Sequence, residues 1–143
     1  MVYNSGSEAE TLQIGEKISK ILKPGDVVGI LGEMGAGKTV LVRGIARGLG
    51  YNGRVTSPTY TIVNEYPTSP LLFHFDLYRL GSASELYDIG FEDYIARGGI
   101  CAVEWFEKAQ DEFDCDVEIF AGRVGEDDNK RRFTVTARGR DVL

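Results

Sequence analysis

The sequence has few cysteines, no long apolar run and fewer basic than acidic residues, and each shortage excludes a class of protein. Its two cysteines, Cys101 and Cys115, do not stand at metal-ligand spacing from each other or from the one histidine. We therefore expect two idle thiols and no disulfide. No segment is apolar enough over its length to span a bilayer. Residues 1–7 lack the basic and apolar regions of a signal peptide, so we expect a cytoplasmic protein with no membrane contact.

The acidic balance argues against proteins that bind nucleic acids broadly through their phosphates. The 143 residues include 16 Lys and Arg against 22 Asp and Glu, a net charge of −6, whereas such binding needs an excess of cations. The one basic cluster, residues 130–132, follows the acidic residues 126–128, and we interpret it as a solvent-exposed hairpin tip. Any role near RNA is therefore expected to be indirect, through a partner protein.

With 43% hydrophobic residues the chain can form a core, and we predict one domain over residues 1–143. Its most informative segment is residues 32–39, Gly-Glu-Met-Gly-Ala-Gly-Lys-Thr, which match the phosphate-binding pattern G-x-x-x-x-G-K-[ST]. The apolar residues 26–31 predict a buried strand before the motif, and residues 40–49 carry apolar side chains at helical spacing after it. Strand, glycine-rich loop and helix in this order predict a P-loop.

The residue types in this loop suit a nucleoside triphosphate and its metal ion. Backbone amides around Gly35, Ala36 and Gly37 can point inward at a phosphate because no bulky side chains crowd the turn. Lys38 supplies a positive charge for the β- and γ-oxygens, and Thr39 supplies a hydroxyl for Mg²⁺. The alternative is a glycine-rich turn that merely binds a stray anion.

The remaining chain alternates helical and strand-like segments. A capping-box pattern at residues 7–10 opens a helix expected over residues 8–22. We predict strands in the second half of residues 54–66, over 71–76 and over 100–105, short helices over 85–89 and 91–96, and a hairpin of strands 117–123 and 132–138. This order predicts an α/β fold, a P-loop NTPase-like three-layer sandwich with a mixed, mostly parallel central sheet and a C-terminal antiparallel hairpin.

Two predicted strands end in a single acid, Asp76 and Glu104. Ligands collect at the carboxyl ends of parallel strands, where one such acid holds Mg²⁺ directly or through water. The residues alone do not decide which of the two touches the metal. His74 lies in phase with Asp76, and we interpret it as a hydrogen-bonded structural histidine rather than a water-orienting one. Arg79 is expected to form an ion pair with Asp76 or to face phosphate.

Several of these segments, taken together, resemble the TsaE (YjeE) family of bacterial P-loop ATPases. The resemblance rests on GEMGAGKT, SPTYTIVNEY, HFDLYRL and the pair Glu104-Trp105, in this order, and covers residues 7–107. It implies an ATPase, weak alone, that uses ATP and Mg²⁺ and acts on a complex of the proteins TsaD and TsaB. It also implies a role in threonylcarbamoylation of adenosine 37 of tRNA, with tRNA contacted only through that complex.

The resemblance also implies roles for particular residues. Lys38, Asp76 and Glu104 are the expected catalytic group, with Thr39 and Glu104 on the metal and Asp76 on the attacking water. The expected ATP-binding residues are Thr11, beside the adenine, and Gly35, Ala36, Gly37, Lys38, Thr39 and Val40. The expected switch or partner-sensitive residues are Ser57, Thr59, Thr61 and Trp105.

Two other functions remain open at this point. A small-molecule kinase would share the P-loop, but no arginine-rich lid segment occurs between the predicted sheet strands. A non-catalytic, nucleotide-responsive binding module would not need the full set of Lys38, Thr39, Asp76 and Glu104. A GTPase is disfavoured because Asn129-Lys130 is not followed by the aspartate of the guanine-reading N-K-x-D pattern.

Overall fold

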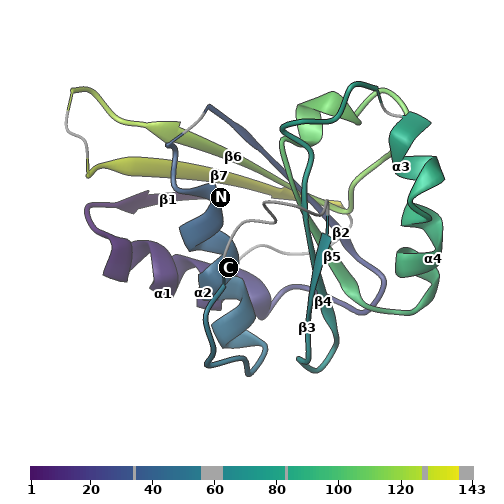
Figure 1. Ribbon diagram of the computed structural model, residues 1–143. Coiled ribbons are helices and arrows are strands. Elements are labelled where there is room, and N and C mark those ends of the chain that lie inside the picture. The colour runs from purple at the N-terminus through teal and green to yellow at the C-terminus, as the bar shows by residue number, and fades with distance from the viewer. Residues whose placement is uncertain (34, 56–62, 83, 127–128, 139–143) are drawn as a thin grey trace.

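The computed structural model describes residues 1–33, 35–55, 63–82, 84–126 and 129–138 (Figure 1). These residues form one seven-stranded sheet with the strand order β1-β7-β6-β2-β5-β4-β3. The strands are β1 Val2–Ser5, β2 Val27–Gly32, β3 Val63–Tyr66, β4 Leu72–Asp76, β5 Ile100–Glu104, β6 Val117–Arg123 and β7 Arg131–Ala137. The helices are α1 Glu8–Ser19, α2 Lys38–Gly48, α3 Ser84–Asp88, α4 Phe91–Ala96 and the 3-10 helix η1 Phe106–Lys108.

The centre of the sheet is parallel and both sides are antiparallel. β2 pairs in parallel with β5 and β6, and β4 pairs in parallel with β5. β7 is antiparallel to β6, which confirms the predicted hairpin, and β3 is antiparallel to β4. Strand β1 was not predicted from the sequence. It lies antiparallel to β7, outside the hairpin, and forms one edge of the sheet. Four residues at an edge carry too weak an alternation of apolar and polar side chains to be recognised.

Alternating residues of the strands build two separate cores, which makes the molecule a three-layer sandwich. Val28 and Ile30 of β2 pack with α1 and α2, whereas Val27 and Leu31 face α3, α4 and η1. Figure 1 shows α1 and α2 on one side of the sheet and α3 and α4 on the other. Because side chains of a strand alternate between faces, apolar residues at every position bury both sides of the central strands.

Helix α1 begins where the sequence predicts and ends earlier. The Ser7 hydroxyl accepts from the Glu10 amide at 3.2 Å, and the Glu10 carboxylate accepts from the Gly6 amide at 3.2 Å. After Ser19 the chain continues through tighter turns with i to i+3 hydrogen bonds, such as Ile21 amide to Ile18 carbonyl at 3.0 Å. The helix expected to extend to residue 22 therefore included one final turn that is not α-helical.

Helices α1 and α2 approach each other through two glycines. A Cβ on Gly15 would lie 2.7 Å from Gly44 Cα, and a Cβ on Gly44 would lie 2.4 Å from the Leu12 carbonyl oxygen. No side chain fits at either position without moving a helix backbone. The two helices therefore pack backbone to backbone, and α1 is held close to the segment that begins α2.

The two cysteines are unpaired, as expected. Cys101 is fully buried in β5, and its burial raises the thiol pKa to about 12. Cys115 is half-buried, and burial together with the nearby Glu118 carboxylate raises its pKa as well. A raised pKa keeps both thiols protonated and unreactive. Among the helices that the structure describes, none is long and apolar enough to cross a membrane.

Candidate functional site

A cavity of about 480 Å³ opens at the carboxyl ends of β4 and β5, next to the beginning of α2. Its walls come from four parts of the chain: the start of α1, the P-loop with the first turn of α2, the ends of β4 and β5, and the start of β7. The residues that line it are Ser7, Glu8, Thr11, Gly35, Gly37, Lys38, Thr39, Val40, Asp76, Tyr78, Glu104, Trp105, Asn129 and Arg131. Of the predicted site residues in the described part, only Ala36 is not among them.

The glycine-rich loop has the backbone conformation that its glycines allow. Gly35 has φ +79° and Gly37 has φ +90°, a left-handed region that residues with a Cβ adopt rarely. Gly37 is the N-cap of α2, so the helix begins at Lys38, two residues before the apolar stretch 40–49. Ala36 is fully buried beneath the loop. The first amides of α2 are thereby left facing the cavity, where they can bind an anion.

Lys38 is almost completely buried at the centre of the cavity. Its Nζ donates to the Gly32 carbonyl oxygen at 2.5 Å and lies 3.5 Å from the centre of the Trp105 ring. Burial lowers the lysine pKa, while the carboxylates of Glu107, Glu104 and Asp76 act in the opposite direction. The ammonium group is thus held by a carbonyl and an aromatic face, contacts that a phosphate oxygen could replace.

The two strand-end acids lie side by side, since Asp76 and Glu104 are register partners in the parallel pair β4–β5. Glu104 is buried, and both of its carboxylate oxygens accept from the Thr39 hydroxyl, at 3.1 and 3.3 Å. Asp76 is half-buried and accepts from the Tyr78 amide at 3.0 Å. Burial raises the pKa of Asp76, and the neighbouring Glu104 carboxylate adds to that rise.

His74 is the predicted structural histidine. Its Nε2 contacts a carboxylate oxygen of Glu104, and its side chain has no exposed surface. The other ring nitrogen, Nδ1, is buried without a hydrogen-bond partner in the part of the chain that the structure describes. The predicted Arg79–Asp76 ion pair is absent: within the described ranges Arg79 is exposed and forms no ion pair.

Trp105 lies at the mouth of the cavity in an unusual backbone conformation. Its φ of +60° makes it the one left-handed residue other than glycine among those described. This turn ends β5, begins η1 and directs the indole ring onto Lys38, and Tyr78 packs on Trp105 with 5.1 Å between ring centres. A left-handed tryptophan costs of order 1 kcal/mol and persists where the surroundings fix it, often at functional sites.

The opposite wall comes from α1. Thr11 is buried and its hydroxyl lies 2.7 Å from that of Ser5, which also donates to the Ser7 carbonyl at 2.8 Å. Thr11 and Val40 line the cavity together, as expected of neighbours in one binding site. The predicted switch residues Ser57, Thr59 and Thr61 lie outside the described residues.

Several residues of the site were not predicted from the sequence, and two of them, Glu107 and Arg131, are charged residues whose placement is informative. Glu107 accepts from the Gly32 amide at 3.2 Å, and its charge acts on Lys38. Its position in the 3-10 helix directly after the left-handed Trp105 has no signal in the sequence. The interpretation of residues 130–132 as a solvent-exposed tip holds for Lys130 and Arg132 but is wrong for Arg131, which is half-buried and lines the cavity.

The arrangement fits Mg²⁺ bound jointly by the protein and a phosphate. Within the described residues, no three His, Cys, Asp or Glu side chains form a complete metal site. Mg²⁺ is commonly bound by one or two protein oxygens, with phosphate and water oxygens completing its shell. The paired oxygens of Thr39 and Glu104 are such a partial ligand set.

The chain is similar to proteins of one family. Residues 5–133 match the family model described as threonylcarbamoyl adenosine biosynthesis protein TsaE. The chain is 43% identical to the tRNA threonylcarbamoyladenosine biosynthesis protein TsaE of Haemophilus influenzae, over 72% of this chain and 69% of that protein. It is 37% identical to the protein of the same name from Bacillus subtilis, over 94% and 85%. The crystal structure of Bacillus subtilis YdiB superposes with a TM-score of 0.77 and 32% identity, covering 97% of this chain and 86% of that one.

Proposed function

This chain belongs to the TsaE family of tRNA threonylcarbamoyladenosine biosynthesis, and on that premise we propose that it is a Mg²⁺-dependent ATPase acting on a complex of TsaB and TsaD. The observation that carries the proposal is one cavity that unites the amide-lined loop, buried Lys38 and two adjacent acids. Each of these groups serves phosphoryl transfer, and a mere anion-binding turn requires neither acid. We place the activity in the cytoplasm, with tRNA reached only through the partner complex.

The metal ligands are Thr39 and Glu104. Their hydrogen bond brings a hydroxyl and a carboxylate to the same point. Mg²⁺ bound there would neutralise charge on the β- and γ-phosphates. His74 holds the Glu104 carboxylate from the other side, which limits its rotation. These contacts therefore hold Glu104 and Thr39 in position for one metal ion.

Asp76 orients the attacking water and accepts its proton. Its carboxylate lies beside Glu104 and, among the described residues, accepts one hydrogen bond, from the Tyr78 amide, which leaves acceptor capacity. A raised pKa makes this carboxylate a stronger base than an exposed aspartate. When water attacks the γ-phosphorus, the bond to the bridging oxygen breaks, ADP and phosphate form, and the proton of the water passes to Asp76.

Lys38 stabilises the charge on the transferred phosphoryl group. Its ammonium group contacts the Gly32 carbonyl and the Trp105 ring. These contacts keep Lys38 oriented into the cavity at low cost, since neither partner is a full anion. A triphosphate offers a stronger, charge-assisted partner, so Lys38 exchanges its neutral contacts for phosphate oxygens on binding.

The test is steady-state ATP hydrolysis with and without the TsaB–TsaD complex. Lys38→Ala and Glu104→Ala should each lower the complex-stimulated rate by about 100-fold or more. Lys20→Ala and Glu118→Ala are matched controls, because both side chains are exposed and lie outside the cavity. Circular dichroism checks that all four variants are folded.

Each other outcome points to a different function. Unchanged hydrolysis in Lys38→Ala and Glu104→Ala would show that the assigned site is wrong. Phosphorylation of a metabolite by the wild type would favour the kinase alternative. Saturable Mg-ATP binding in calorimetry, without turnover even with the partner complex, would favour a non-catalytic binding module.

A further inference from the structure

The first residue of the P-loop, Gly32, is held on both sides of its Cα atom. Its amide donates to Glu107 Oε2 at 3.2 Å, and its carbonyl oxygen accepts from Lys38 Nζ at 2.5 Å. Gly32 has φ +137°, and a Cβ there would lie 2.1 Å from the Ala121 carbonyl oxygen. Only glycine fits at this position, and the backbone of glycine is the least restricted of all residues. The two hydrogen bonds therefore fix the peptide groups that open the loop.

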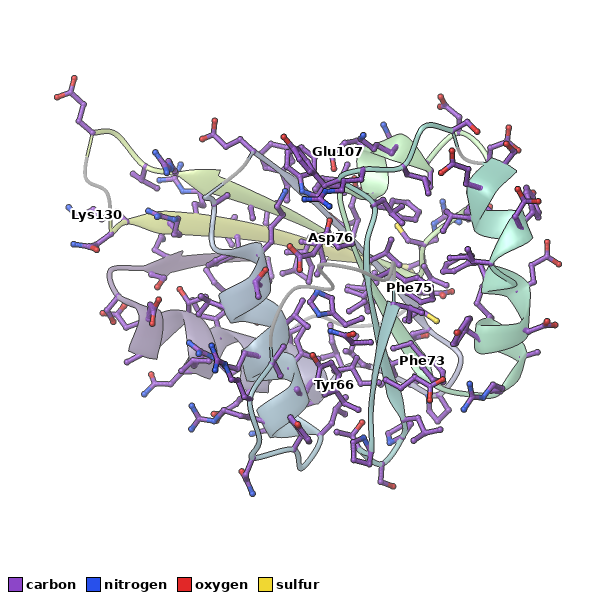
Figure 2. The ribbon with its side chains drawn as sticks, viewed as in Figure 1. Tyr66, Phe73, Phe75, Asp76, Glu107 and Lys130 are labelled. Carbon is purple, nitrogen blue, oxygen red and sulfur yellow. The ribbon has the colours of Figure 1, made fainter. Side chains whose placement is uncertain are left out.

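Glu107 is the partner of Gly32 that lies outside the cavity. Its side chain is half-buried in η1 and does not line the cavity wall. Figure 2 shows Glu107 at the same end of the sheet as Asp76. Any effect of Glu107 on chemistry in the cavity must therefore pass through the residues on which it acts.

The helix η1 is attached to the sheet without the help of Glu107. Phe106 is buried, and its ring lies 2.7 Å from the position that a Cβ on Gly29 of β2 would occupy. Lys108 Nζ donates to two carbonyl oxygens of the loop after β4, at 2.6 and 3.2 Å. A purely structural role for Glu107 would be to join η1 to the strands, and the residues on either side of it already do so.

Glu107 also acts on Lys38 through its charge. Its second carboxylate oxygen, Oε1, is buried and has no hydrogen-bond partner among the described residues. Burial lowers the pKa of Lys38, and of the three carboxylates that oppose this change Glu107 acts most strongly. A buried carboxylate without further partners attracts a buried ammonium group. Glu107 therefore favours the position of Lys38 at the Gly32 carbonyl, and it does so from outside the space that a phosphate would fill.

We propose that Glu107 is a positioning residue: by holding Gly32, it fixes the start of the P-loop and keeps Lys38 directed at the transferred phosphoryl group. The proposal rests on the proposed ATPase function. Lysine is a flexible side chain, so fixing it in place before the reaction removes an entropic cost. Glu107 thereby acts on the reaction without contact with the nucleotide.

The test is the steady-state kinetics of ATP hydrolysis with the TsaB–TsaD complex, in variants of this one position. Glu107→Ala removes the acceptor, and Glu107→Asp keeps the charge but is one methylene too short to reach the Gly32 amide. Both should lower kcat by about tenfold and change KM by less than about threefold, since the loop amides that bind phosphate remain. Glu107→Gln keeps an acceptor at the same length and should stay within about threefold of the wild type, because Glu104 and Asp76 still act on Lys38.

Glu112→Ala is the matched control. Glu112 is a glutamate of the segment that follows η1, where its side chain is exposed and lies outside the cavity. Its removal takes away the same charged side chain without touching the P-loop. Both kcat and KM should therefore match those of the wild type.

Nuclear magnetic resonance of the protein without added nucleotide gives a readout that does not depend on turnover. Lys38 Nζ lies 3.5 Å from the centre of the Trp105 ring, so the ring current shifts the adjacent methylene protons of the lysine upfield. This upfield shift should decrease in Glu107→Ala and Glu107→Asp, because the lysine is no longer held over the ring. It should persist in Glu107→Gln and in Glu112→Ala.

Four results would overturn the inference: wild-type kcat in Glu107→Ala, a loss of activity confined to KM, an unchanged Lys38 shift in Glu107→Ala, or a loss in Glu107→Gln as large as in Glu107→Ala. Thermal melts establish that the variants are folded, and Glu107→Asp carries the test if Glu107→Ala is not. Absence of ATP hydrolysis by the wild type with the complex refutes the proposed function, and the Lys38 shift then still reports whether Glu107 holds this lysine. Wild-type hydrolysis with insensitivity to position 107 refutes the positioning role alone.

Discussion

The two faces of the central sheet are built from the same strands but differ in the chemistry of their side chains. Toward α3 and α4, the strands β4 and β5 present only apolar or thiol side chains, namely Phe73, Phe75, Cys101 and Val103. Toward α1 and α2, the intervening residues change along each strand from apolar to ionisable. These residues are Leu72, His74 and Asp76 in β4, and Ile100, Ala102 and Glu104 in β5. Figure 2 shows Phe73 and Phe75 on the side of α4, and Asp76 at the end of the strand.

The two faces also differ in how their helices pack. On the α3–α4 side, aromatic rings meet edge to face, with Phe91 5.0 Å from both Phe75 and Phe113. On the α1–α2 side, the helices meet through the backbone contact of Gly15 and Gly44. Aromatic clusters supply large buried areas, whereas the glycine contact sets the distance between helices. Stability therefore depends mainly on the α3–α4 face and chemistry on the α1–α2 face, and four substitutions test how complete that separation is.

The largest effect should come from Phe91→Ala in the aromatic cluster. Phe91 is fully buried, and removing its ring should lower the free energy of unfolding by about 4 kcal/mol, as in other large-to-small core changes. Urea denaturation measures the loss, and Phe120→Ala, at a ring that is 55% exposed, is the control. Mg-ATP affinity of the folded variant should match the wild type. A parallel loss of affinity would show that the two faces are coupled.

His74→Leu should produce the next largest loss of stability, because it removes one of the two partners of the buried Glu104 carboxylate, the other being the Thr39 hydroxyl. His74 contacts Glu104 where both side chains are almost without exposed surface, and losing a hydrogen bond to a buried charged group costs about 3 kcal/mol. Denaturation in urea and the Mg²⁺ dependence of ATP turnover should both change. His74→Gln keeps a donor and should lose less. Wild-type stability in His74→Leu would mean that the pair contributes nothing.

Gly44→Ala should link helix packing to nucleotide affinity within the α1–α2 face. The added methyl group would meet the Leu12 carbonyl at 2.4 Å, so α1 has to move, at a cost of about 2 kcal/mol. Since Ser7 and Thr11 of the α1 segment line the cavity, nucleotide affinity should fall as well. Gly6→Ala has room for a Cβ, with a nearest contact of 3.5 Å, and serves as the control. Equal affinity in both variants would refute this coupling.

Asp76→Asn should have the smallest effect and the opposite sign. The Asp76 pKa is raised from 3.8 in the folded protein, so the native state binds its proton more tightly than the unfolded state does. Stability therefore falls as pH rises from 3.8 through the raised pKa, and the amide removes that loss. After allowance for solvent screening, Asp76→Asn should gain about 0.5 kcal/mol at pH 7 and nothing below pH 3.8. Turnover should drop although stability rises. A variant less stable than the wild type at pH 7 would contradict the assigned pKa direction.

The parts of the site that lie within one contiguous segment of the chain could be predicted from the sequence. The strand, glycine loop and helix around Lys38 form a contiguous pattern, and Asp76 and Glu104 each end an apolar run. What it could not predict depends on pairing between distant segments. Arg131 belongs to a run of three cations, and only the register of β7 sends it inward and its neighbours outward. Strand β1 is visible only through its pairing with β7, since its four residues have no distinctive pattern.

The left-handed backbone of Trp105 has a practical consequence for observing this molecule. It is the single tryptophan of the chain, and its indole ring lies against the Lys38 ammonium group. Indole fluorescence responds to nearby charge and to solvent access, so displacement of that lysine alters the emission of the whole protein. The chain thereby contains its own optical reporter: a stopped-flow trace of unlabelled protein follows events at the glycine-rich loop directly.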